Sequence, residues 1–223
     1  MLLSLFTQPL YSSLRIEEDA GYLLAYQSDY KLFCPGFNIP IRLKYSDIDN
    51  PLSLVISLQY TYIYSKYSYP LTWTDPLTSL DSSLSINALD YYHIATLGMG
   101  LDYNLKVNWQ ANDTKALKYF YPYIGADLNF YFLGIYRETD VKSGTIPDYL
   151  FEEYRNQFRG LTPTIGATAR LGTRIRMGKK DFLNLMAQYS VLIPEESTKK
   201  LYVNHFIQFH IGYERQIKLL STK

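Results

Sequence analysis

The chain has 223 residues with a formal net charge of +1 and a pI of about 7.7, so neither a basic field for nucleic acid nor an acidic solvating tail is expected. No run of 18 apolar residues occurs, which excludes a conventional transmembrane helix. Tyrosine accounts for 23 residues, and such amphipathic aromatic side chains settle at membrane interfaces. Because we find no linker-like stretch or composition shift, we predict a single folded domain.

The N-terminus reads Met-Leu-Leu-Ser-Leu-Phe-Thr-Gln-Pro-Leu-Tyr-Ser-Ser. It resembles the end of a secretory signal peptide whose apolar core is short and whose positive n-region is missing. We therefore predict a truncated signal peptide over 1–13, cleaved near Ser12 or Ser13. A barrel domain is predicted over 14–217 and a basic C-terminal tail over 218–223.

Alternation of apolar and polar residues with period two recurs along the chain and predicts β-strands. The clearest case lies at 118–136, where the even positions from Phe120 to Phe132 are apolar and the odd ones include Asp127 and Asn129. This segment exceeds the usual strand length of about five or six residues. In chain order, the eight predicted strands cover 14–26, 37–45, 53–65, 90–106, 118–136, 161–176, 182–193 and 201–215.

Two long connections separate these strands, at 66–89 and 137–159. In the second, Asp148 caps a segment ending at Tyr154 that we expect to form one or two helical turns. We interpret it as a solvated loop helix rather than a plug or lid. The single cysteine, Cys34, lies in a predicted connection, where we expect it to be inert, and it excludes an intrachain disulfide framework.

Eight antiparallel strands can close as a soluble barrel with an apolar interior or as a membrane barrel with an apolar exterior. A tyrosine-rich soluble sandwich is a further alternative. The connections after odd-numbered strands are mostly longer than those after even-numbered strands, which favours a membrane barrel with long extracellular loops. Six glycines lie on the polar face, where a narrow barrel needs small residues: Gly98, Gly100, Gly125, Gly166, Gly172 and Gly212.

Aromatic residues on the apolar face gather at the two ends of the predicted strands, as two girdles would at the two surfaces of a membrane. The girdle at the loop ends contains Tyr26, Phe37, Tyr60, Tyr62, Tyr64, Tyr91 and Tyr136. The girdle at the turn ends contains Tyr45, Tyr103, Phe120 and Tyr213. Between them the apolar face carries mainly Leu, Ile, Ala and Val.

Strands such as Tyr-Ile-Gly-Ala-Asp-Leu-Asn-Phe-Tyr-Phe and Thr-Pro-Thr-Ile-Gly-Ala-Thr-Ala-Arg-Leu-Gly give the chain a pattern that resembles the small eight-stranded outer-membrane barrels of Gram-negative bacteria, the OmpA/OmpX type. The resemblance implies an all-β fold: an eight-stranded antiparallel up-and-down transmembrane β-barrel with a polar lumen, located in the bacterial outer membrane. It is architectural and carries over no active site. The chain departs from this type in the basic residues that follow Tyr213, where the last strand usually ends on an aromatic residue.

The predicted lumen contains charged residues that must be paired or keep water around them. Asp127 and Arg170 are predicted near mid-height, with Arg42, Asp102 and Arg174 nearer the turn ends. We interpret these five as a structural ion-pair network. The alternative is a porin-like narrow path for small polar solutes, with Arg170 and Asp127 at its constriction. The other predicted inward charges are Glu17, Asp19, Lys44 and Arg176.

A structural or surface-interaction role is the preferred prediction, because eight strands fill their own interior. Its partners would be the lipid bilayer, lipopolysaccharide and an extracellular molecule bound through loops 66–89 and 137–159; a monomer is expected. A lipid-modifying enzyme would need a nucleophile and a carboxylate near a histidine at the membrane boundary. His93 and His205 lie there without a serine two residues on, and His210 faces the lumen. We therefore predict no catalytic residue, no cofactor and no metal ligand.

Overall fold

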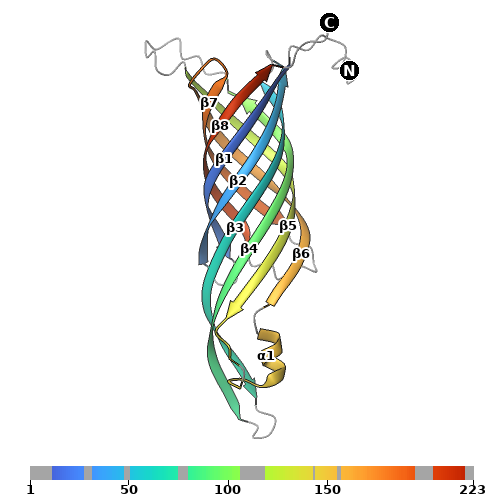
Figure 1. Ribbon diagram of the computed structural model, residues 1–223, viewed down its shortest axis with the longest axis vertical. Coiled ribbons are helices and arrows are strands. Elements are labelled where there is room, and N and C mark those ends of the chain that lie inside the picture. The colour runs from blue at the N-terminus through green and yellow to red at the C-terminus, as the bar shows by residue number, and fades with distance from the viewer. Residues whose placement is uncertain are drawn as a thin grey trace.

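The structure is a computed structural model, and it describes residues 12–27, 32–47, 51–74, 80–105, 119–142, 144–154, 157–193 and 203–218. Within these ranges the chain forms eight strands and one short helix (Figure 1). The elements are β1 (Ser12–Gln27), β2 (Leu32–Asp47), β3 (Leu52–Thr74), β4 (Asp81–Asn104), β5 (Phe120–Thr139), α1 (Asp148–Tyr154), β6 (Gln157–Arg176), β7 (Asp181–Ile193) and β8 (Val203–Lys218).

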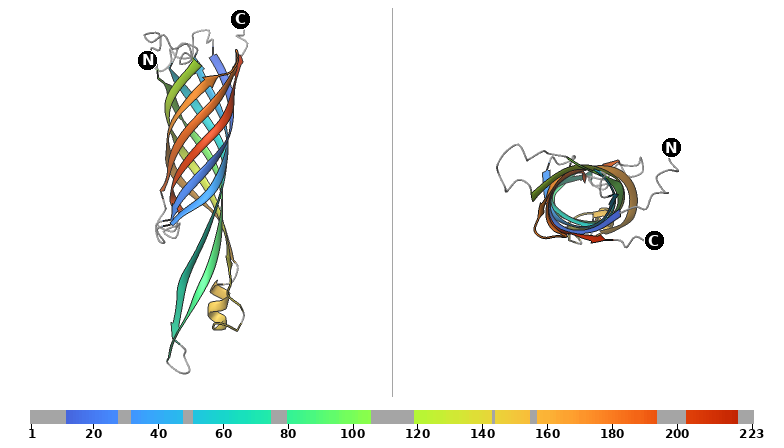
Figure 2. Two further views of the ribbon diagram at one scale, coloured as in Figure 1. Left: turned by 90° about the vertical axis from the view of Figure 1, so that its left-hand side faces the viewer. Right: turned by 90° about the horizontal axis from the view of Figure 1, so that it is seen from above.

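The eight strands form one closed antiparallel barrel. Each strand pairs with its neighbours in the sequence, and β1 pairs with β8, from Ser13 opposite Lys218 to Gln27 opposite Val203. Figure 2 shows the closed ring from above. The start of β1 and the end of β8 mark what we call the terminal end of the barrel, and α1 lies beyond the opposite end, the loop end (Figure 1). The predicted fold class is confirmed.

Side-chain burial alternates along the strands with the polarity that the sequence analysis predicted. On β5, Leu128 is 72% exposed on the outer wall, whereas its neighbour Asp127 is 7% exposed inside the barrel. An apolar exterior around a polar interior is the arrangement of a transmembrane barrel and the reverse of a soluble one. Among the described residues, no helix is long and apolar enough to cross a membrane.

At the loop end, aromatic rings of the outer wall contact one another across four strands. The ring of Phe37 stacks on Tyr62 at 5.3 Å between centroids, Tyr62 lies 6.3 Å from Tyr91, and Tyr91 stacks on Tyr136 at 6.1 Å. We call this row the aromatic belt. Aromatic side chains are likewise exposed on the outer wall at the terminal end, where Tyr45, Tyr103 and Tyr213 lie.

The prediction of a long connection at 66–89 was wrong. Strands β3 and β4 continue past the aromatic belt as a two-stranded ribbon, and their pairing is unbroken out to Thr74 opposite Asp81. We call 66–74 together with 81–89 the ribbon. Figure 1 shows it projecting from the loop end of the barrel, beside α1. Apolar and polar residues alternate along the ribbon as they do in the barrel, but its serines and Pro70 gave the segment the composition of a loop.

Three other predicted connections also differ from the structure. The segment 137–159 is shortened by strand residues at both ends, although its predicted helical turns are confirmed as α1. The connection at 105–119 is longer than the one at 28–31, so connection length does not alternate as expected. Cys34 lies in β2 and is buried, not placed in a loop.

The barrel strands extend slightly beyond the predicted domain bounds of 14–217. Strand β1 begins at Ser12, and β8 includes Lys218. The rest of the predicted signal peptide, 1–11, and the rest of the basic tail, 219–223, lie outside the described residues.

Candidate functional site

The terminal half of the lumen is filled by ion pairs centred on Lys44 of β2. Its ammonium contacts the carboxylate of Glu17 and lies 3.1 Å from Asp102 Oδ2 and 3.3 Å from Glu214 Oε2. The ring of Tyr123 lies 4.7 Å from the same nitrogen, a cation–π contact. These four partners come from β1, β4, β8 and β5, so one side chain ties together strands from around the barrel.

Two arginines extend the network from this centre. Arg42 donates a hydrogen bond to Glu17 Oε1 at 2.7 Å and also pairs with Asp19. Arg170 donates to Asp102 Oδ1 at 2.7 Å and also pairs with Asp127. The structure thus brings Asp127 and Arg170 together, whereas Arg42 binds the carboxylates of β1 on a separate branch.

A third branch runs through Glu214, which the sequence analysis did not place in the lumen. Arg174 Nη1 lies 3.3 Å from Glu214 Oε1, and Arg15 Nη1 lies 3.4 Å from the same oxygen. Following the inward face of the last strand two residues beyond Gly212 would have found this glutamate. Arg176 was wrongly placed inward: it is exposed where β6 ends and donates to the Gly178 carbonyl at 2.9 Å.

The network contains equal numbers of acidic and basic side chains, so their formal charges cancel. None is more than 8% exposed. Removing one partner of such a buried pair leaves an uncompensated charge, which costs about 3–5 kcal/mol. We call these ten residues the lumen network: Arg15, Glu17, Asp19, Arg42, Lys44, Asp102, Asp127, Arg170, Arg174 and Glu214.

Inward-facing glycines provide the space that these long side chains occupy. A Cβ atom at Gly125 would meet the carboxylate of Asp102 and the guanidinium of Arg170, and one at Gly172 would meet the ring of Tyr123. The crowding of these positions agrees with the predicted need for small residues on the inner face.

A neutral polar layer lies between the lumen network and the loop end. Gln188 accepts a hydrogen bond from Arg42 at 3.1 Å and donates one to Gln208 at 3.2 Å. Gln208 Oε1 also accepts from Asn38 at 2.6 Å and lies 3.1 Å from His210 Nε2. His210 is buried in the lumen, as predicted. In this layer amides and the imidazole of His210 take the place of ion pairs.

Toward the loop end the inner face becomes apolar, which the sequence analysis did not predict. Several strands carry a large apolar residue at the inward positions nearest this end, and their side chains pack together across the lumen. We call this group the apolar plug: Leu23, Ala25, Cys34, Ile63, Tyr92, Ile94, Tyr131, Leu133, Leu192 and Phe206. An ion entering the plug would lose its hydration among mostly apolar side chains.

A cluster of hydrogen bonds joins β3, β4 and β5 where the ribbon leaves the barrel. Arg137 donates from Nε to Asp90 Oδ1 at 2.7 Å and from Nη2 to Asp90 Oδ2 at 2.9 Å. The hydroxyl of Tyr67 donates to Asp90 Oδ2 at 2.9 Å, and that of Tyr92 lies 3.4 Å from the same oxygen. We call these four residues the clasp. It fixes the base of the ribbon to the barrel wall.

The ribbon has a small apolar core of its own, shared with the chain around α1. Leu71, Ile86 and Ile146 are buried there, and five partly buried residues pack against them: Trp73, Leu84, Val141, Leu150 and Phe151. The predicted solvated helix is therefore only partly solvated. One face of α1 packs on the ribbon through Leu150 and Phe151, while Asp148 and Glu152 on the helix are exposed. The interior side of the ribbon is packed rather than open to water.

Asp140 attaches the segment before α1 to the ribbon. The backbone N–H and the side-chain amide of Asn87 donate to its carboxylate at 2.9 and 2.5 Å. Hydrogen bonds to the ionised carboxylate favour the charged form, so those from Asn87 lower the pKa of Asp140 below its usual range.

The two outward-facing histidines each contact a tyrosine hydroxyl. Tyr60 Oη lies 2.8 Å from His93 Nδ1, and Tyr189 Oη lies 2.8 Å from His205 Nδ1. Both histidines occupy the apolar face near the loop end, as predicted. Within the part of the chain that the structure describes, no group of three His, Cys, Asp or Glu side chains is placed to hold a metal ion.

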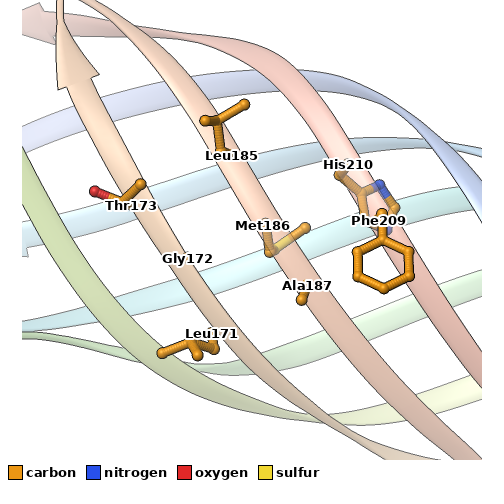
Figure 3. Close-up of a pocket in the computed structure, with 8 residues that line it drawn as sticks. All are labelled: Leu171, Gly172, Thr173, Leu185, Met186, Ala187, Phe209 and His210. Atoms are coloured by element: carbon orange, nitrogen blue, oxygen red, sulfur yellow. The ribbon is translucent and has the colours of Figure 1, made fainter.

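An open hollow lies on the outer wall across β6, β7 and β8 (Figure 3). Its outward-facing lining consists of Leu171, Thr173, Leu185, Ala187 and Phe209. Gly172, Met186 and His210 complete the lining. With one hydroxyl and otherwise apolar side chains, the outward-facing part suits contact with lipid tails.

Comparisons with known proteins identify the architecture but no family. No protein-family model matches the chain, and no curated protein matches its sequence. The crystal structure of Neisserial surface protein A matches 92% of this chain and 97% of its own, with 17% identity and a TM-score of 0.50. A major outer membrane protein of Thermus thermophilus matches 92% and 99%, with 10% identity and a TM-score of 0.51.

A third solved structure, Ail, the attachment invasion locus protein of Yersinia pestis, matches 93% of this chain and 100% of its own, with 12% identity and a TM-score of 0.48. At such low identities these similarities show the fold alone. The chain thus has the architecture of a small eight-stranded outer-membrane β-barrel, and the resemblance drawn from the sequence is confirmed.

Proposed function

We propose that this protein is a bacterial outer-membrane barrel that displays the ribbon and α1 outside the cell as a surface-interaction element. The observation that carries the proposal is the ribbon, which extends past the aromatic belt with its own apolar core. A surface that is ordered before binding loses less conformational entropy when a partner binds. The ribbon and α1 are thus suited to contact a molecule beyond the membrane.

The interior of the barrel supports an anchoring role over a conducting one. The ten charges of the lumen network are paired with one another, and the apolar plug occupies the lumen between that network and the ribbon. A solute would have to displace both. We therefore favour the display role over a narrow pore for polar solutes, and expect no single-channel steps in planar bilayer recordings of the purified barrel.

We propose no catalytic role. A lipid-modifying site at the membrane boundary would need a nucleophile beside a histidine. The outward-facing histidines are instead hydrogen-bonded to tyrosines, His93 to Tyr60 and His205 to Tyr189.

Removing the ribbon while keeping the barrel tests the display role. We suggest a variant in which 68–87 is replaced by a short turn, expressed in a Gram-negative host beside the unaltered chain. Folded barrel is quantified by heat-modifiable gel migration, and cells with equal amounts are compared for autoaggregation and for adhesion to coated and cellular surfaces. We expect one of these properties to depend on the ribbon. If none appears with the unaltered chain, or if all persist without the ribbon, the proposal is wrong.

A further inference from the structure

The outward side chains of β3 change chemistry in order toward the loop end. Leu54, Ile56 and Leu58 come first, then three tyrosines, then Lys66, and all of these except the half-buried Tyr62 are exposed. Alternate residues of one strand share a face, and each step of two residues advances roughly 6.6 Å along the strand. The order of hydrocarbon, aromatic ring and ammonium is the order of apolar tails, interface and charged headgroups in a lipid leaflet.

His93 presents a hydrogen-bond donor at the height of the tyrosines. It lies opposite Tyr62 in the register, and the two rings meet edge to face at 5.3 Å. The Tyr60 hydroxyl contacts Nδ1 at 2.8 Å, and when this hydroxyl is the donor, the imidazole proton is on Nε2. Because His93 is exposed, its Nε2–H can donate outward from the barrel wall.

The surroundings of Lys66 leave its ammonium open to a ligand. In the described residues no carboxylate pairs with it, and in the register Leu89 separates it from Glu138. Glu138 is engaged by a residue of β4, since the Tyr91 hydroxyl donates to it at 3.3 Å. The pairing of β2 with β3 ends at Ile63, so within the described strands no neighbour flanks Lys66 on that side. An anion can approach Lys66 there, away from Glu138.

We propose that this wall of β3 and β4 is a headgroup site for a phosphate-bearing acyl lipid. Lys66 binds the phosphate, and His93, held by Tyr60, donates to an ester or amide carbonyl nearer the tails. The two polar groups are four residues apart in the register along β3, on the order of 13 Å. The flexible four-carbon stem of Lys66 lets its ammonium reach back toward His93, which shortens this span toward the smaller separation of carbonyl and phosphate in a headgroup. The site requires the barrel to lie in a bilayer, and it does not depend on what the ribbon binds.

Native mass spectrometry of the delipidated barrel tests this assignment with three probes: phosphatidylglycerol, a monogalactosyl diacylglycerol with the same chains, and lipid A. Lys66→Gln should reduce retention of the phosphate-bearing lipids about fivefold and leave the galactolipid unchanged, since one lysine near a headgroup contributes about 1 kcal/mol. His93→Phe should weaken retention of all three, because the carbonyl is common to them. Lys142→Gln, which removes an exposed lysine near α1, is the matched control.

The variants must migrate as folded, heat-modifiable barrels before retention is compared; Tyr60→Phe, which frees the imidazole, replaces His93→Phe if the latter does not fold. Whichever of lipid A and phosphatidylglycerol the unaltered barrel retains more strongly identifies the source of the phosphate. Both outcomes support the site. Retention of both phosphate-bearing lipids by Lys66→Gln at the level of the unaltered chain would overturn it.

Discussion

Asp90 of β4 accepts two hydrogen bonds from the guanidinium of Arg137 of β5, at 2.7 and 2.9 Å, at the height where the ribbon leaves the barrel. Both oxygens of Asp90 are thereby engaged, and the carboxylate is fully buried. Charge-assisted pairs with two parallel bonds fix geometry as well as contributing energy. The angle at which the ribbon projects is thus set by a contact between strands and not by the ribbon alone.

Replacing this carboxylate should loosen the ribbon while the barrel stays closed. Asp90→Asn weakens the two charge-assisted hydrogen bonds from Arg137, and we expect a cost of about 1.5–3 kcal/mol, concentrated at the clasp. Hydrogen exchange should then be faster for amides of 66–74 and 81–89 than in the unaltered chain, with 54–58 unchanged. Arg215→Gln, at a largely exposed ion pair, serves as control. Unchanged ribbon protection in Asp90→Asn would contradict this role of the clasp.

The centre of the lumen network should be the position most sensitive to loss of charge. Lys44→Met exposes Glu17, Asp102 and Glu214 to one another without their shared ammonium, and we expect about 3–5 kcal/mol of destabilisation. Urea unfolding in lipid vesicles measures it. Adding Glu17→Gln should recover part of the loss, because it removes one of the carboxylates. Lys142→Met, at an exposed lysine, should have no effect; equal stability of both lysine variants would argue against the network.

Space on the inner face can be tested with two glycines. A Cβ at Gly100 would meet the carbonyl oxygen of Ala126 and the carboxylate of Asp127. Because backbone cannot move aside, Gly100→Ala should cost about 1–3 kcal/mol. At Gly178 the nearest atom would be Asp181 Oδ2 at 3.1 Å, on a movable side chain. Gly178→Ala should therefore leave the thermal midpoint of heat-modifiable migration nearly unchanged, and a larger shift there than for Gly100→Ala would refute the packing argument.

Acid should weaken the attachment of the α1 segment to the ribbon. The pKa of Asp140 is lower in the folded state than in the unfolded chain, mainly because of the hydrogen bonds from Asn87. Its contribution is therefore present above the unfolded pKa and is lost as pH falls through the folded pKa. The effect should be small, since Asp140 is exposed. The hydrogen-exchange rate of the Asn87 backbone amide is measured at each pH in the unaltered chain and in Asp140→Asn. The two rates should differ at neutral pH and become equal in acid, whereas a difference that does not change with pH would contradict this role of Asp140.

Period-two alternation was sufficient to predict the eight strands and the direction of each face, because the lipid-facing and lumen-facing positions differ so strongly in polarity. It could not predict ion-pair partners, which depend on register across strands: Arg42 binds Glu17 of β1, while Arg170 binds Asp102 of β4. The ribbon was missed because its serines and Pro70 resemble those of a loop, and because the segment on which its apolar face packs, around Ile146, lies much later in the chain.

The apolar plug was missed for a related reason. Leu133 and Phe206 occupy positions that the alternation assigned to the polar face, but the change to apolar character toward the loop end has meaning only when several strands are aligned side by side. Local pattern thus predicted the wall of the barrel, whereas the filling of its interior required the closed structure.

The central claim, a barrel that displays its ribbon outside the cell, is tested most directly by labelling single cysteines in intact cells with a membrane-impermeant maleimide. Ser85→Cys places a thiol on the exposed face of the ribbon, and Lys179→Cys places one in the turn after β6, at the terminal end. The native Cys34 is buried. We predict labelling of Ser85→Cys in intact cells and of Lys179→Cys only after the outer membrane is permeabilised. The reverse order, with both variants folded, would contradict the account.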